Sequence, residues 1–288
     1  MQSSLEDTKF ILKKYNISAN KKLGQNFLID DNIINKIIDS SSVNKNDLII
    51  EIGPGLGTLT AKLLENAGKV IAIELDDRMI KILSDRFKLY DNFTLIHNDV
   101  LKIDLNQIIK DNIENLDNVK VVANLPYYIT TPIIMKLLED RVNIQSITVM
   151  VQKEVADRIT ARPGDKLSGA ITYSIDYYAE ARKVAFVSKE CFMPSPEVDS
   201  EVIKLILRDK PKVNVAKEEL FFKIIKASFS QRRKTLLNGL VNSGINNKEK
   251  LKEILEEMGL NIEIRGEKLS IEQFADLADR IDKEINSN

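Results

Sequence analysis

Apolar runs alternate with amphipathic helical patterns over the first two thirds of the chain. The runs are short and rich in Val, Ile and Leu, which is typical of buried strands. They predict strands at residues 47–52, 69–73, 93–97, 119–123 and 144–151. Between runs, apolar residues recur with helical spacing, as in the isoleucines between positions 33 and 38. Strands that alternate with helices predict a doubly wound α/β sheet with helices on both faces.

The last third of the chain has a different pattern. Two further apolar runs, 184–187 and 198–207, predict an antiparallel pair that closes the sheet. After the charged linker Arg208-Asp-Lys-Pro211-Lys, no strand pattern recurs. Amphipathic spacing instead predicts helices at residues 221–229, 235–241, 248–258 and 271–285. We therefore expect two domains, an α/β domain over 1–210 and a small all-helical domain over 211–288.

Composition narrows the possible chemistry. The chain has 288 residues, 43% of them hydrophobic, which is enough for a full core. A net charge of -1 excludes a uniformly basic nucleic-acid binder, so any contact with a polyanion needs a local patch. Cys191 is the one cysteine and His97 the one histidine, which excludes an internal disulfide and argues against zinc sites and histidine triads. We expect no metal centre.

The N-terminus is polar and charged over residues 1–14. No apolar run approaches the roughly 18 to 20 residues that span a bilayer. The expected protein is soluble and cytoplasmic, without a membrane partner.

Polar or glycine residues stand at the ends of four successive predicted strands, namely Gly53, Glu74, Asp99 and Asn124. Ligands of doubly wound sheets bind outside the carboxyl ends of the strands, so these four residues are expected to share one binding site. Glu74 can accept hydrogen bonds from ribose hydroxyls. Asp99 can accept from an adenine amino group, although an ordinary turn aspartate explains it as well.

The turn after the first of these strands is rich in glycine, with Gly53, Gly55 and Gly57. Such a turn lets the backbone approach a ligand closely. The dinucleotide fingerprint would place its third glycine at position 58, where this chain has Thr58, so the spacing disfavours NAD.

Asn124-Leu125-Pro126-Tyr127 follows the strand at 119–123. Pro126 restricts Leu125 to extended backbone and fixes the direction of the carbonyls. Asn124 adds an amide oxygen and Tyr127 a flat face for stacking. Carbonyl oxygens that accept both hydrogens of an exocyclic base amine would turn its lone pair outward, so this loop suits a nucleobase amine. A helix-starting turn is the plainer interpretation.

Three other segments have both a functional and a structural interpretation. Asn26 and Leu28 lie in an irregular segment that could be an ordinary loop. Phe192, before two prolines, could face a ligand or fill the core. Arg232, Arg233 and Lys234 form the local basic patch, which is either a phosphate-contacting surface or a solvated helix junction.

Taken together, these motifs resemble those of the ribosomal RNA adenine N6-dimethyltransferases, which use S-adenosyl-L-methionine. The resemblance runs from about Asn20 to Ala278. It rests on Asn26-Phe27-Leu28, Glu51-Ile-Gly-Pro-Gly-Leu-Gly57, Glu74, Asp99, Asn124-Leu-Pro-Tyr127 and Phe192-x-Pro-x-Pro196. It implies a Rossmann-like class I methyltransferase domain followed by a small helical domain that helps to hold rRNA.

The resemblance also implies a role for each motif. Asn26 and Leu28 would bind the methionine end of the cofactor, with Gly53, Gly55 and Asn124 against it. Glu74 would take the ribose and Asp99 the adenine. Asn124 with the carbonyls of Leu125 and Pro126 would orient the target N6, between Tyr127 and Phe192. The patch Arg232, Arg233 and Lys234 would contact RNA.

The implied substrate is a pair of adjacent adenines near the 3′ end of small-subunit rRNA, within an assembling 30S particle and with a monomeric enzyme. The C-terminal motifs favour this small-subunit branch. Two alternatives stay open at this point. One is dimethylation of a single large-subunit rRNA adenine, which confers antibiotic resistance, and the other is a non-catalytic ribosome assembly factor.

Overall fold

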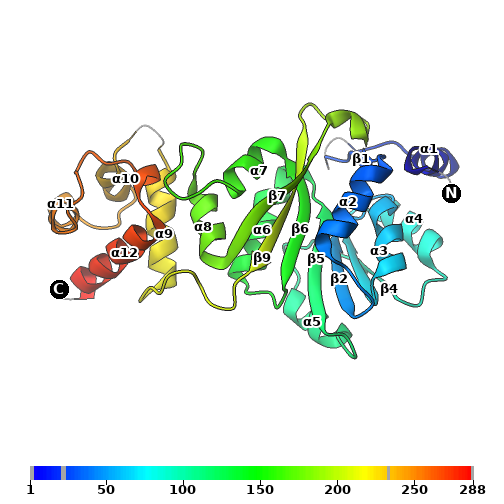
Figure 1. The fold of residues 1–288 in the computed structure, drawn as a ribbon, viewed down its shortest axis with the longest axis horizontal. Helices are drawn as coiled ribbons and strands as arrows, with labels where there is room; N and C mark the ends of the chain where they lie inside the picture. Colours follow the sequence, from blue (N-terminus) through cyan, green and yellow to red (C-terminus); the bar gives the residue numbers. More distant parts are fainter. Residues whose placement is uncertain (1–2, 21–23, 232–233, 287–288) are drawn as a thin grey trace. The chain divides into compact units, whose positions relative to one another are not determined.

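The structure is a computed structural model, and it describes residues 3–20, 24–231 and 234–286. The chain divides into two compact units. The first comprises Met1–Ala156 and Ala181–Leu207, and the second comprises Asp157–Glu180 and Arg208–Asn288. The first unit holds the sheet and the second is helical (Figure 1).

A seven-stranded sheet forms the centre of the first unit, in the order β4-β3-β2-β5-β6-β9-β7 (Figure 1). The strands are β2 (Asp47–Ile52), β3 (Lys69–Glu74), β4 (Phe93–His97), β5 (Asn118–Asn124), β6 (Ser146–Gln152), β7 (Ala179–Val187) and β9 (Ser200–Leu207). Strands β2 to β6 pair in parallel, and β9 pairs antiparallel to β6. The predicted doubly wound sheet, with an antiparallel strand beside the last parallel one, is confirmed.

Helices flank this sheet and bury their apolar faces against it. They are α2 (Asp31–Ser41), α3 (Thr58–Asn66), α4 (Asp77–Phe87), α5 (Leu105–Asn112) and α6 (Thr130–Glu139), while α7 (Lys153–Ile159) spans the division between the two units. The isoleucine pattern predicted α2, and Ile33, Ile34 and Ile37 are all buried. Asp30 caps this helix, because its carboxylate accepts from the N–H groups of Asn32 and Ile33.

The N-terminal segment contains two elements that the hydrophobic pattern does not indicate. The polar leader forms helix α1 (Ser4–Lys14), which starts at a capping box between Ser3 and Glu6. Further on, β1 (Phe27–Leu28) pairs antiparallel with β8 (Phe192–Met193). Because β1 is two residues long and its partner lies far along the chain, its own sequence carries little strand signal.

The second unit is built from α8 (Ala170–Tyr178), α9 (Glu218–Phe229), α10 (Leu236–Asn242), α11 (Lys248–Glu257) and α12 (Ile271–Asn286). It therefore includes residues 157–180, which the sequence pattern places in the first domain. Tyr173 of α8 shows why. Its ring contacts Phe229 and Phe274, and its hydroxyl donates to the Leu269 carbonyl at 2.6 Å. These partners come much later in the sequence, so local periodicity cannot reveal them.

Candidate functional site

A pocket of about 1040 Å³, counting the solvent at its mouth, lies at the carboxyl ends of β2, β3, β4 and β5. Ten of the predicted site residues line it. They are Asn26, Leu28, Gly53, Gly55, Glu74, Asp99, Asn124, Leu125, Pro126 and Tyr127. Most of them lie at or after the ends of four parallel strands, which meet at one edge of the sheet. Asn26 and Leu28 come from the N-terminal segment.

The glycine turn between β2 and α3 forms one wall of the pocket. Gly53 has a φ of +67° and Gly57 a φ of +82°, in the region that side chains rarely adopt. A Cβ on Gly57 would lie 2.6 Å from the ring of Phe87. Glycine at position 57 therefore lets α3 begin directly beside α4, and the turn keeps its backbone at the pocket surface.

Glu74 ends β3 and is 7% exposed. Its carboxylate accepts from the N–H groups of Leu75 at 2.8 Å, Asp76 at 2.9 Å and Gly55 at 3.2 Å. Burial raises the pKa of Glu74, while these three hydrogen bonds act in the opposite direction. A carboxylate has about four acceptor sites, so the backbone fixes its orientation and leaves acceptor capacity for a ligand hydroxyl.

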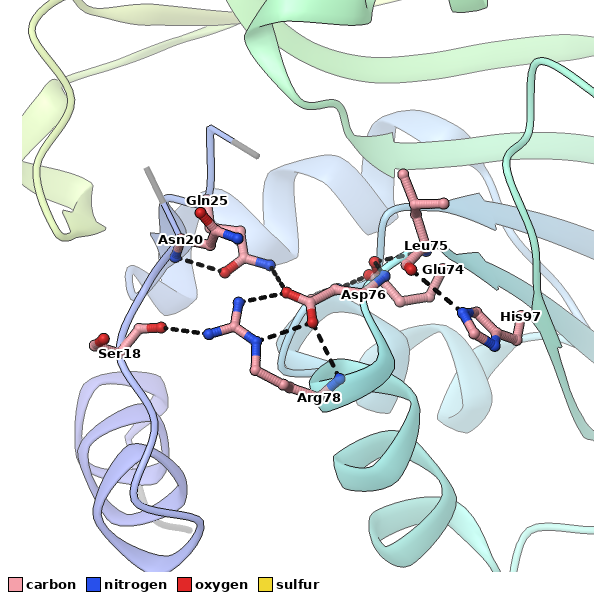
Figure 2. Close-up of polar contacts among 9 residues, drawn as sticks. Ser18, Asn20, Gln25, Glu74, Leu75, Asp76, Arg78 and His97 are labelled. Carbon is pink, nitrogen blue, oxygen red and sulfur yellow. Dashed lines mark hydrogen bonds and ion pairs between the residues drawn. The ribbon is translucent and has the colours of Figure 1, made fainter. Parts of the chain in front are cut away.

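Asp76 connects the strand end to the N-terminal segment (Figure 2). It caps α4, forms an ion pair with Arg78 at 2.5 Å and accepts from the Gln25 side chain at 2.8 Å. Gln25 in turn accepts from the N–H of Asn20. The hydrogen bonds from Arg78 are the main reason why the pKa of Asp76 is lowered. This network ties Asn20 and Gln25 to the end of β3, so Asp76 does more than cap α4.

Asp99 and His97 lie at the end of β4. Asp99 lines the pocket and accepts from the N–H of Leu101 at 3.0 Å, as in an ordinary turn, so both interpretations of this residue are compatible with its position. His97 is exposed and lies 3.3 Å from the Leu75 carbonyl (Figure 2). It does not line the pocket, which agrees with a structural role.

Asn124 ends β5 beside the N-terminal segment. Its Nδ2 donates to the carbonyl of Asn26 at 3.4 Å, which leaves the amide oxygen as the acceptor. Leu125 is buried, and its N–H donates to the Met150 carbonyl at 3.3 Å. The loop is therefore attached to β6 on one side and to the N-terminal segment on the other.

The carbonyl of Pro126 has a different role from the expected one. It accepts from the N–H of Ile129 at 3.2 Å and from the hydroxyl of Thr130 at 3.1 Å, because the chain turns here into the 3₁₀ helix η2 (Tyr127–Ile129). Both lone pairs of this oxygen are used within the loop. The other acceptor oxygens of this loop are Asn124 Oδ1 and the Leu125 carbonyl, and both residues line the pocket.

The two predicted aromatic residues differ in position. Tyr127 lines the pocket, and its hydroxyl lies 2.6 Å from Ser200 Oγ. Phe192 is 3% exposed and belongs to the hydrophobic core, next to Leu28 in the β1–β8 pair. It does not line the pocket, so its position does not support stacking on a ligand. The half-exposed Tyr128, the residue after the Asn124-Leu-Pro-Tyr127 motif, lines the pocket instead.

Glu51 also lines the pocket, although it is not among the predicted site residues. Burial is the main cause that raises its pKa to about 8, and neighbouring Glu74 adds to the shift. The Thr60 hydroxyl on α3 acts in the opposite direction, but Glu51 Oε2 and Thr60 Oγ1 each lack a well-formed hydrogen bond among the described residues. The sequence signal that could have identified it is a carboxylate within the apolar run 48–52 of β2.

The basic patch can be located only in part. Arg232 and Arg233 lie outside the described residues, and Lys234 is exposed between α9 and α10 of the second unit. Within residues 3–20, 24–231 and 234–286, no three His, Cys, Asp or Glu side chains gather as a metal ion would require. In the same part of the chain, no helix is long and apolar enough to cross a membrane.

The fold and the pocket define a Rossmann-like domain of the methyltransferase class. The family model for ribosomal RNA adenine dimethylase matches residues 16–283, and the chain belongs to this family. A relative from Lachnoclostridium phytofermentans, named ribosomal RNA small subunit methyltransferase A, is 52% identical over 96% of both chains. One of the same name from Bacillus licheniformis is 50% identical over 95% of both chains.

Solved structures agree with this assignment. A dimethyladenosine transferase from Plasmodium falciparum is 28% identical, with a TM-score of 0.73 over 90% of this chain and 98% of that chain. The 23S rRNA methyltransferase ErmE shares the fold, at 24% identity and a TM-score of 0.66 over 89% of this chain and 100% of that chain.

Proposed function

We propose that this protein transfers methyl groups from S-adenosyl-L-methionine to the N6 atoms of two adjacent adenines near the 3′ end of small-subunit rRNA. It acts in the cytoplasm, as a monomer, on an assembling 30S particle. The observation that carries the proposal is the pocket that brings the glycine turn, Glu74, Asp99 and the Asn124 loop together. Relatives that are about half identical over nearly their whole length bear the name of a small-subunit rRNA methyltransferase.

The residues of the pocket fit this cofactor. Glu74 has acceptor capacity for the ribose hydroxyls, and Asp99 can accept from the adenine amine. The N-terminal segment with Asn26 and Leu28 lies beside Asn124, where the methionine end would bind. The bound cofactor supplies a methyl group already activated on a sulfonium, so the protein needs to position the substrate rather than provide a strong base.

The substrate amine is a poor nucleophile because its lone pair is delocalised into the base. Asn124 Oδ1 and the Leu125 carbonyl would accept its two hydrogens and favour a pyramidal nitrogen. Tyr127 would stack on the base after it leaves its own stack. Outside the pocket, Lys234 together with Arg232 and Arg233 would contact phosphates, which position the RNA without reading its sequence.

Mass spectrometry of rRNA from cells that lack this protein tests the substrate. We expect both neighbouring dimethyladenines of the small-subunit rRNA to disappear and to return when the gene is restored. Loss of a single large-subunit dimethyladenine, with the small-subunit pair intact, would instead assign the protein to the large-subunit branch. Restoration by an Asn124→Ala variant would indicate an assembly factor that does not need catalysis.

A prediction about cofactor binding concerns Glu74. Glu74→Ala should weaken S-adenosylmethionine binding by roughly 1.5 to 3 kcal/mol, the scale of a hydrogen bond to a charged group. Calorimetric titration measures this loss. Asp77→Ala is the matched control, because Asp77 is exposed on the next helix and does not line the pocket. Equal affinities of the two variants would remove Glu74 from the cofactor site.

A further inference from the structure

The hydroxyl of Tyr127 makes a contact that base stacking does not require. It lies 2.6 Å from Ser200 Oγ, and either oxygen can be the donor. Tyr127 begins η2 directly after Pro126, so its ring projects from a short turn rather than from the sheet. A ring in that position has two side-chain torsions to fix, and the contact with Ser200 fixes the far end of the ring.

Ser200 is a rigid anchor for this contact. It is fully buried and is the first residue of β9, in antiparallel register with Gln152 of β6. The residue before it is also anchored, because Asp199 accepts from the Lys189 N–H through its carboxylate and from the Lys153 N–H through its carbonyl. The hydroxyl of Ser200 is therefore held by the central sheet, and not by a loop.

The electrostatic surroundings keep Tyr127 in its neutral form. Burial is the main cause that raises the pKa of its phenol, and the charge of Asp199 adds to the shift, whereas the Ser200 contact acts in the opposite direction. At neutral pH the phenol retains its proton and can donate to Ser200 or accept from it. Ser200 itself does not line the pocket.

We infer that Ser200 is a positioning residue for methyl transfer, which holds the ring of Tyr127 so that its face is ready for the target base. This inference rests on the proposed function. It also gives the segment after Phe192 a role other than stacking, since this segment leads from the β1–β8 pair directly into Ser200. Preorganising a stacking ring matters because a small misplacement of the base moves its N6 away from the methyl group.

The test combines Ser200→Ala, Tyr127→Phe and the double variant. Each single variant removes the contact and keeps the ring, so we expect kcat on immature small-subunit particles to fall about three- to tenfold, the scale of one ordinary hydrogen bond. The double variant should be no slower than either single variant, because both remove the same contact. Cofactor affinity should be unchanged. Tyr15→Phe is the control, because it removes a comparable hydroxyl contact to Asp85 at 3.0 Å outside the pocket.

A second measurement does not depend on activity. In protein with ¹³C-labelled tyrosines, the Tyr127 ring signal, assigned by its loss in Tyr127→Phe, should shift or broaden in Ser200→Ala. An unchanged signal overturns the inference, because the contact would not hold the ring. A shifted signal with wild-type kcat also overturns it, since the contact would then only stabilise the fold. A wild-type protein without methyl-transfer activity would count against the proposed function. This result is measured on the wild type alone, so it is distinguishable from the two outcomes that overturn the role of Ser200.

Discussion

Asn124→Ala is expected to lower kcat by about a hundredfold or more while leaving cofactor affinity nearly intact. The expected size is that of losing one preorganised polar contact to the transition state. The physical reason lies in the orientation of the amide. Its Nδ2 donates to the Asn26 carbonyl, so in the proposed function Oδ1 is the acceptor for the substrate amine, and alanine removes it.

Single-turnover methylation of immature small-subunit particles, at saturating cofactor, measures this effect directly. Asn112→Ala is the matched control, because the Asn112 side chain donates to the Ile108 carbonyl at 2.8 Å in α5, outside the pocket. Asn124→Asp keeps an acceptor oxygen and should lose less than the alanine variant. If the rates of Asn124→Ala and Asn112→Ala are the same, the loop has only a structural role.

The sequence predicts the location of a site residue best where that residue lies at the end of a parallel strand. Parallel strands bring their carboxyl ends to the same edge, so Gly53, Glu74, Asp99 and Asn124 could be placed together without knowing any distance. Hydrophobic periodicity also predicted the strands and most helices, because the residues that form one buried face lie close together in the sequence.

Features set by distant partners could not be predicted in this way. Phe192 is buried because β8 pairs with β1, more than 160 positions earlier. The carbonyl of Pro126 is occupied because the chain turns into η2 and Thr130 folds back on it. Residues 157–180 join the helical unit through partners such as Phe274. In each case the structure depends on a contact that the spacing of hydrophobic residues does not reveal.

The protonation state of Glu51 also depends on distant residues and could not be predicted from the local sequence. Its identity was visible in the strand, but its pKa of about 8 follows from complete burial among the residues of β2 and α3 and from the nearby charge of Glu74. A carboxyl group in that position holds its proton at neutral pH, because an ionised form would be desolvated without full hydrogen bonding.

This protonation predicts a specific dependence of stability on pH. Below pH 4.5 the group is protonated in both the folded and the unfolded chain, and its full contribution to stability is present. Between pH 4.5 and about 8 the unfolded chain loses the proton while the folded chain keeps it, so stability falls as pH rises. Glu51→Gln removes this titration. Its stability relative to the wild type should therefore rise by roughly 3 to 4 kcal/mol between pH 5 and pH 8.

Chemical denaturation of both proteins without cofactor, over that pH range, measures the difference, and titrations common to both proteins cancel. Infrared difference spectra at pH 7 provide an independent reading, because the wild type should show the carbonyl stretch of a protonated carboxyl that Glu51→Gln lacks. A stability difference that stays constant with pH would mean that Glu51 is ionised in the fold. Its charge would then need a partner in the pocket that the described contacts do not provide.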